Sequence, residues 1–206
     1  MQKIKVFIVD DHAILRKGLT SLLNQEDDFE VVGDAPDGQT AVLQVKKVAP
    51  DVVITDLSMP GMDGAETARR IRETTPSAKI LILTTFGTSD GISRALDMGA
   101  DGAIMKSADF PDLVNAIRAI TRNDRYIAPD IQEILDSDPP LPALSDRQTD
   151  ILQALGKGLT NKEIAKLLNI SLPVVKEHVN LLFAKMGVAN RTEAVAIALR
   201  KHLLRA

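Results

Sequence analysis

Cysteine and tryptophan are absent from the 206 residues of this chain, and aromatic residues make up only 3% of it. The lack of cysteine excludes disulfides and zinc–thiolate sites, and it fits a reducing compartment. With so few aromatic rings, a surface on which single-stranded bases stack is not expected. No segment approaches the roughly 20 apolar residues of a membrane span, and no signal peptide is visible. These absences predict a cytoplasmic protein with no membrane partner.

Charge of the two signs is distributed unevenly along the chain. The net charge is −3, but residues 142–206 contain 10 Lys and Arg against 5 Asp and Glu, a surplus of +5. The preceding part is acidic, with 15 basic and 23 acidic residues. A basic segment on an acidic chain favours a nucleic-acid partner for that segment, although a small domain with this charge is also common without one.

Short apolar runs alternate with segments of helical periodicity over residues 1–123. The runs are rich in Val and Ile and are bounded by polar residues or Gly, which is typical of buried parallel strands. They are Lys5–Val9, Glu30–Val32, Val52–Thr55, Ile80–Thr84 and Gly102–Met105. Between them, apolar residues recur at helical spacing, as in Ile14, Leu15, Leu19, Leu22 and Leu23. This alternation predicts a five-stranded, parallel, doubly wound α/β domain over residues 1–123.

The pattern changes after residue 123. Residues 124–142 include the Pro-rich, charged stretch Asp136–Pro142 and are expected to form a linker, with a short helix over Pro129–Leu135. Residues 143–206 show no strand pattern, and capping residues and glycine stops predict four helices there. The predicted helices are Asp146–Leu155, a second that opens at the Thr160 capping box, a third from Ser171 to Met186, and Thr192–Leu204. The third segment is therefore expected to be an all-α four-helix domain.

Polar residues stand where the predicted strands end. The first strand is followed by Asp10 and Asp11, and the third by Asp56. The fourth ends at Thr84, and the fifth is followed by Lys106. In an open parallel sheet these ends meet in one crevice, where three carboxylates must take up protons or hold a cation. Clustered oxygens suit Mg²⁺, and a lysine and a hydroxyl beside them suit phosphoryl transfer to a carboxylate.

The strand-end residues resemble the receiver domain of bacterial two-component response regulators. The resemblance covers about residues 1–123 and rests on Val9–His12, Asp56–Gly64, Thr84, and Gly99–Gly102 with Lys106. It implies a flavodoxin-like fold and phosphorylation of Asp56 by the phosphohistidine of a sensor histidine kinase, with Thr84 and Lys106 holding the phosphoryl group. It also implies a Mg²⁺ site. The implied ligands are Asp10, Asp11, Asp56 and the backbone carbonyl of Ser58.

One departure from the receiver pattern concerns the switch residue. Three residues before the lysine, receivers commonly carry a Tyr or Phe that rotates on phosphorylation, but here Ala103 stands there. Phosphate acceptance is expected to survive this change, whereas the usual relay is in doubt, and Phe86 is a candidate substitute. A phosphorylation-independent adaptor with a retired switch therefore stays open as an alternative.

An enzyme is the other alternative, namely a phosphatase of the haloacid dehalogenase type with an aspartyl nucleophile. Such enzymes need a second Asp two residues after the nucleophile, and here Ser58 stands at that position. We therefore expect a signalling protein rather than an enzyme.

The second and third helices of the C-terminal segment have helix-turn-helix spacing. In the second, the residues expected to face inward are Ile164, Ala165, Leu167 and Leu168. In the third, the predicted core residues are Val175, Val179, Leu182, Phe183 and Met186. The opposite face of the third helix is then free to enter the major groove of double-stranded DNA. Base contacts are expected from Val174, Lys176, Glu177 and Asn180. Phosphate contacts are expected from Lys162, Lys166, Lys185 and Arg191.

Residues 144–195 resemble the LuxR-type helix-turn-helix of NarL/FixJ regulators. The motifs are Leu159–Ala165, Val175–Val179, Met186–Val188 and Arg191–Ala194. The family often has Thr where Val174 stands, and the outward face is poor in donors, so docking on a protein stays open beside DNA binding and transcription regulation. Phosphorylation is expected to release or reposition this domain. A homodimer is expected when the protein is phosphorylated or DNA-bound. The last helix has an apolar face, Val195, Leu199 and Leu203, for which pairing of two copies and plain packing on the core both stay open.

Overall fold

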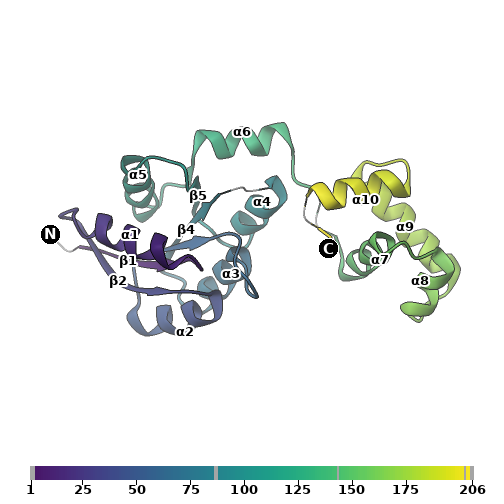
Figure 1. Ribbon diagram of the computed structural model, residues 1–206, viewed down its shortest axis with the longest axis horizontal. Coiled ribbons are helices and arrows are strands. Elements are labelled where there is room, and N and C mark those ends of the chain that lie inside the picture. Colours follow the sequence, from purple (N-terminus) through teal and green to yellow (C-terminus); the bar gives the residue numbers. More distant parts are fainter. Residues whose placement is uncertain (1–2, 86–87, 143, 202, 205–206) are drawn as a thin grey trace. The chain divides into compact units, whose positions relative to one another are not determined.

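The computed structural model describes residues 3–85, 88–142, 144–201 and 203–204 (Figure 1). Contacts within the chain divide it into two compact units, Met1–Pro139 and Pro140–Ala206. The first unit is an α/β domain, and the elements of the second are all helices in the part of the chain that the structure describes. None of the described helices is long and apolar enough to cross a membrane.

A parallel sheet forms the centre of the first unit. Its strands are β1 (Ile4–Val9), β2 (Phe29–Ala35), β3 (Val52–Asp56), β4 (Lys79–Thr84), β5 (Gly102–Met105) and β6 (Tyr126–Ile127). Their order in the sheet is β2-β1-β3-β4-β5-β6, with every neighbouring pair parallel. The direction of winding reverses between β1 and β3, and open α/β sheets bind ligands outside the carboxyl ends of the strands at such a reversal.

Helices cover both faces of this sheet (Figure 1). They are α1 (Ala13–Leu23), α2 (Gly38–Val48), α3 (Gly64–Thr74), α4 (Ser89–Asp97) and α5 (Phe110–Thr121). Helices α2, α3 and α4 pack in succession, while Arg118 of α5 pairs with Asp28 in the loop between α1 and β2. Every residue of β3 is buried, which explains why this strand is a continuous apolar run in the sequence. The doubly wound α/β fold is confirmed.

The sheet has one strand more than predicted. Strand β6 is two residues long, and just after it the Ala128 backbone N–H donates to the Ala103 carbonyl at 3.0 Å. Helix α6 (Pro129–Ser137) follows and packs against β5 and α4, with Ile131 fully buried in the core of the first unit. The expected linker over 124–142 therefore packs with the first unit as far as Pro139. A two-residue strand is too short to show a period, so the sequence did not reveal it.

Four helices surround the core of the second unit. They are α7 (Asp146–Gly156), α8 (Asn161–Leu167), α9 (Leu172–Met186) and α10 (Arg191–Arg200). Thr160 forms the predicted capping box, and Ser145, predicted as an N-cap, forms a capping box as well. Gly187 ends α9 in the left-handed region, with φ of 66°. Ser171 occupies the N-cap of α9 without a side-chain cap bond. The predicted four-helix domain is confirmed.

Three apolar residues that the helical spacing placed in the core lie on the surface. Leu167 is 60% exposed because it is the last residue of a short helix that buries only Ile164. Ile14 is 89% exposed and Leu22 is 42% exposed because the stripe of α1 that packs on the core consists of Leu15, Leu19 and Leu23. Periodicity identified the apolar side of each helix but not how wide the buried stripe is or where it ends.

The last helix is shorter than predicted, since α10 ends at Arg200 and not at Leu204. After it, the Leu203 backbone N–H bonds to the Ala198 carbonyl at 2.8 Å. Leu204 then lies against Gly156, where a Cβ would come within 2.8 Å of its Cδ1 atom. The terminal apolar residues therefore pack on α7 and do not extend the helix.

Replacement of Ile131 by Ala tests whether α6 belongs to the core of the first unit. Because this side chain is fully buried, its truncation is expected to destabilise the unit by about 2–5 kcal/mol. The measurement is urea denaturation followed by circular dichroism. Glu133→Ala, at an exposed position of the same helix, should change stability by less than about 0.5 kcal/mol. Equal stability of Ile131→Ala and the parent chain would contradict the packing of α6.

Candidate functional site

The chain topology brings the predicted strand-end residues together at the carboxyl edge of the sheet. Asp10 follows β1, Asp56 is the last residue of β3, and Thr84 is the last residue of β4. Lys106 follows β5, and its backbone N–H donates to the Thr84 carbonyl at 2.7 Å. The parallel order β1-β3-β4-β5 places these four strand ends side by side, as the sequence predicted.

Lys106 connects two buried carboxylates. Its Nζ atom lies 2.6 Å from Asp10 Oδ2 and 2.9 Å from Asp56 Oδ2. Asp10 is 1% exposed and Asp56 is 4% exposed, so both acidic groups have lost most of their hydration. A buried carboxylate requires a partner of opposite charge or hydrogen bonds that replace water. The ammonium group supplies this for both residues, and one negative charge of the trio stays uncompensated.

The pKa values of these groups follow from this packing. Burial raises the pKa of Asp56, and the charge of Asp10 adds to this effect, while Lys106 lowers it in part. Burial lowers the pKa of Lys106, but hydrogen bonds and attraction from Asp10 and Asp56 outweigh it and leave the pKa raised. Lys106 therefore stays protonated near neutral pH, as a charge that could hold a phosphoryl group must.

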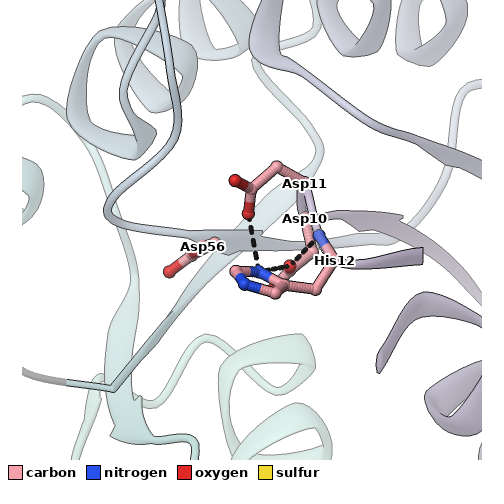
Figure 2. A group of neighbouring side chains, drawn as sticks. All are labelled: Asp10, Asp11, His12 and Asp56. Carbon is pink, nitrogen blue, oxygen red and sulfur yellow. Dashed lines mark hydrogen bonds and ion pairs between the residues drawn. The ribbon is translucent and has the colours of Figure 1, made fainter. Parts of the chain in front are cut away.

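Four side chains of types that can bind a metal ion cluster at this edge of the sheet (Figure 2). One ligand atom from each of Asp10, Asp11, His12 and Asp56 lies within 4.8 Å of all the others. Nδ1 of His12 lies 2.7 Å from Asp11 Oδ1 and 3.1 Å from Asp10 Oδ1. Carboxylate oxygens in excess over neutral ligands, next to an uncompensated negative charge, suit a hard cation such as Mg²⁺. The three aspartates thus fit the predicted metal site.

Thr84 presents a hydroxyl group with an unused hydrogen-bonding capacity. Its side chain is fully buried, and Oγ1 has no hydrogen-bond partner among the residues that the structure describes. A buried hydroxyl left unpaired is costly in free energy, which is why such groups mark functional sites. An oxygen-rich ligand on Asp56, such as a phosphoryl group, could accept this hydrogen bond.

The turn after β3 is built to hold Asp56 in place. The Ser58 backbone N–H donates to Asp56 Oδ1 at 3.3 Å. The Gly64 backbone N–H donates to the Leu57 carbonyl at 2.9 Å, and a Cβ at Gly64 would lie 2.2 Å from the Asp56 carbonyl oxygen. Asp63 caps α3 by accepting from the Glu66 N–H. Only glycine allows α3 to start this close to Asp56.

The helix-turn-helix surface is exposed as predicted. The side chains of α8 and α9 that were expected to contact DNA are open to solvent, whereas Arg191, the first residue of α10, is half-buried. The exposed ones are Lys162, Lys166, Val174, Lys176, Glu177, Asn180 and Lys185. Their DNA contacts stay predictions.

Two of these basic residues also have partners within the protein. Arg191 donates from its guanidinium to the carbonyls of Leu159 and Leu155, both at 2.6 Å. Lys185 Nζ lies 3.2 Å from Gln148 Oε1. Arg191 therefore joins the start of α10 to the end of α7, in addition to any contact with DNA.

Two family models match this chain. The response regulator receiver domain matches residues 6–118, and the luxR family of bacterial regulatory proteins matches residues 142–198. The chain belongs to the LuxR-family response regulators. The receiver match spans Asp10, Asp56 and Lys106, and the second match spans the helix-turn-helix of α8 and α9.

Relatives of this response regulator match over nearly its whole length. Response regulator protein VraR of Staphylococcus aureus is 34% identical over 206 residues, which cover 98% of this chain and 99% of VraR. The crystal structure of ChrA, a response regulator of a heme-sensing two-component system, is 37% identical, with a TM-score of 0.60 over 98% of this chain and 100% of ChrA. RcsB of Salmonella enterica serovar Typhimurium, bound to a promoter in the presence of the phosphomimetic BeF₃⁻, is 28% identical, with a TM-score of 0.69 over 95% of this chain and 97% of RcsB.

The switch position of this response regulator is a small residue inside the sheet. Ala103 is fully buried in β5 and pairs with Ile82 of β4 and Ile127 of β6. A methyl group has no alternative rotamer, so a relay from the crevice does not run through a rotating ring at this position. Phe86, the candidate substitute, lies outside the described residues.

Sequence reasoning did not single out Arg16. This residue of α1 donates from Nη1 to the backbone carbonyl of Asp10 at 2.6 Å and from Nε to Asp34 Oδ2 at 2.7 Å. The available signal was an arginine in the first turns of the helix that follows the acidic pair. Arg16 therefore contacts the site through the backbone carbonyl of Asp10 and not through the Asp10 carboxylate.

Replacement of Gly64 by Ala tests the closeness of α3 to Asp56. The added methyl group must displace the Asp56 backbone, which is expected to cost about 1–3 kcal/mol of stability. Gly18→Ala in α1 is the matched control, since a Cβ there meets nothing within 4 Å and should stabilise the helix by about 0.5–1 kcal/mol. Urea denaturation measures both. Equal effects of the two substitutions would contradict the account of this turn.

Replacement of Arg191 by Ala tests its role inside the second unit. Loss of the bonds to Leu155 and Leu159 leaves two carbonyls without a charged donor, and a destabilisation of about 1.5–3 kcal/mol is expected. Thermal unfolding followed by circular dichroism measures the loss. Lys162→Ala, at an exposed position, should leave stability within about 0.5 kcal/mol. An Arg191→Ala variant as stable as Lys162→Ala would show that the two hydrogen bonds do not contribute to stability.

Proposed function

We propose that this response regulator accepts a phosphoryl group on Asp56 from the phosphohistidine of a sensor histidine kinase, and that phosphorylation controls how its LuxR-type domain binds double-stranded DNA. The observation that carries the proposal is the buried carboxylate of Asp56 beside the Lys106 ammonium, with a Thr84 hydroxyl at the end of the neighbouring strand that is unpaired among the described residues. A bacterial regulator with a DNA target acts in the cytoplasm.

The proposed transfer moves one phosphoryl group between two nucleophiles. An Asp56 carboxylate oxygen bonds to phosphorus as the P–N bond of the phosphohistidine breaks, and the electron pair of that bond stays on the imidazole nitrogen. Lys106 and Thr84 bind the oxygens of the transferred group and offset its charge. Asp10, Asp11, Asp56 and the Ser58 carbonyl would hold Mg²⁺, which supplies further charge neutralisation when bound. The turn fixed by Gly64 keeps the acceptor oxygen in place.

Phosphorylation changes the charge balance around Lys106. A phosphoryl group adds about −1.5 to −2 charges, and its oxygens are accessible to both the lysine and the Thr84 hydroxyl. A shift of Lys106 and Thr84 toward these oxygens alters the end of β4 and biases the receiver toward a second state. The DNA-binding unit is released or repositioned as a result.

The second unit would bind DNA by placing α9 in the major groove. Its outward residues Val174, Lys176, Glu177 and Asn180 are exposed for base contacts, and the lysines of α8 for phosphate contacts. Leu199 of α10 is 53% exposed, which supports pairing of two copies there, and RcsB dimers have been seen bound to DNA. Two half-sites would then lie about one helical turn apart.

Two other functions are distinguished by simple assays. Ala103, buried where a switch ring would stand, favours an adaptor that binds DNA without regard to phosphorylation. Ser58, two residues after Asp56, disfavours a phosphatase. A gel shift that ignores acetyl phosphate would support the adaptor, and turnover of a phosphate monoester would support the phosphatase.

Phosphorylation with acetyl phosphate and Mg²⁺ tests the proposed acceptor. Intact-mass spectrometry is expected to show one added phosphoryl group on the parent chain and none on Asp56→Asn. Thr84→Ala and Lys106→Met keep the acceptor but lose groups that stabilise the transition state, so their rates should fall by about 10²-fold or more. Phosphorylation of Asp56→Asn at the parent rate would refute the assignment.

Binding to an operator, identified by genome-wide footprinting of the parent chain and of Asp56→Asn, tests the DNA face. Asn180→Ala is expected to cost about 1–3 kcal/mol at the specific site because it removes a base contact. Lys162→Ala should weaken specific and non-specific binding alike and lower the slope of log K against log salt by about 1. Uniform losses for both variants would contradict their division into base and phosphate contacts.

A further inference from the structure

The acidic turn between β1 and α1 is held by a charged side chain that lies outside the crevice. The Arg16 side chain is only 14% exposed. Its guanidinium donates to the Asp10 carbonyl, before the start of α1, at 2.6 Å, and it also donates to Asp34 Oδ2, near the end of β2, at 2.7 Å. A planar guanidinium can make these two bonds in fixed directions at once.

These bonds complete the fixation of Asp10. Its backbone N–H donates to the Ala35 carbonyl at 3.2 Å, and its Oδ1 accepts from the His12 N–H at 2.8 Å. With the carbonyl held by Arg16, both peptide groups next to its α-carbon are tied, and the carboxylate points toward Lys106. The direction of the next residue, Asp11, follows from the same peptide plane.

We propose that Arg16 is a positioning residue for the divalent-cation site, which sets the direction of the Asp10 and Asp11 carboxylates through the Asp10 carbonyl, and that Asp34 holds Arg16 in this orientation. The inference rests on the proposed function of the crevice, because it concerns the cation that assists phosphoryl transfer there. Groups that orient metal ligands commonly change metal affinity 10–100-fold when they are removed.

Charge and geometry predict opposite effects for Arg16. Arg16 is a positive charge beside the acidic cluster and repels a cation, so its removal would strengthen cation binding if charge alone mattered. If Arg16 instead orients two ligands, its removal weakens cation binding. The sign of the change in Mg²⁺ affinity therefore separates a positioning role from a purely electrostatic one.

The test compares Mg²⁺ binding by the full-length chain and four variants. Arg16→Met removes the charge and the bonds, Arg16→Lys keeps the charge but not the fork of donors, and Asp34→Asn weakens the hold on Arg16. Lys17→Met is the matched control, since it removes one positive charge at an exposed position of the same helix. Backbone amide NMR shifts of the β1–α1 turn report the Mg²⁺ dissociation constant, and circular dichroism melting checks that each variant is folded.

The expected result is a dissociation constant for Mg²⁺ raised about tenfold in Arg16→Met and Arg16→Lys, by a smaller factor in Asp34→Asn, and by less than about twofold in Lys17→Met. With acetyl phosphate, half-saturating Mg²⁺ should rise in the two Arg16 variants, while the rate at saturating Mg²⁺ stays near that of the parent chain. If the role of Arg16 were merely structural, its replacement would lower the melting temperature without raising the half-saturating Mg²⁺ concentration.

Unchanged or tighter Mg²⁺ binding by Arg16→Met would overturn the inference, as would parent-like binding by Arg16→Lys. If Arg16→Met does not fold, Arg16→Lys and Asp34→Asn decide the question. Failure of the parent chain itself to bind Mg²⁺ or accept a phosphoryl group would instead refute the proposed function, so the two failures are distinguishable.

Discussion

The Lys106 ammonium group lies between two buried carboxylates, 2.6 Å from Asp10 and 2.9 Å from Asp56. Parallel strands in the order β1-β3-β4-β5 bring these three groups to one edge, and burial makes the negative charges expensive unless they are paired. The ion pairs offset that cost only in part. The result is a site with surplus negative charge and with a Thr84 hydroxyl that has no partner in the described part of the chain. Such a site suits a cation and an oxygen-rich ligand.

Hydrogen bonds and close packing of the backbone hold Asp10 and Asp56 in their orientations. On one side, Gly64 allows α3 to begin against the Asp56 carbonyl. On the other, Arg16 and the N–H of His12 tie the Asp10 residue from two directions. A phosphoryl group that changes the balance of charge at Lys106 therefore acts on a rigid frame, in which small displacements at strand ends are passed to whole elements.

The sequence predicted the meeting of Asp56 and Lys106 because the carboxyl ends of parallel strands lie at one edge, and strands that bury both faces are easily recognised as apolar runs. The extent of each core was harder to foresee. Ile131 lies in the short helix predicted within the linker, but its burial in the core of the first unit was not foreseen. Leu167 fits the apolar periodicity of α8 but lies on the surface. The internal partners of Arg191 were hidden because a basic side chain looks the same in sequence whether it faces a phosphate or a carbonyl.

The most direct test of the central claim is a crystal structure of the chain with Mg²⁺ and beryllium fluoride. The account predicts a beryllofluoride group on Asp56, with Lys106 Nζ and Thr84 Oγ1 both within hydrogen-bond distance of fluorine atoms and the cation between Asp10, Asp11 and Asp56. A beryllofluoride group bound elsewhere, or Lys106 and Thr84 directed away from it, would contradict the claim.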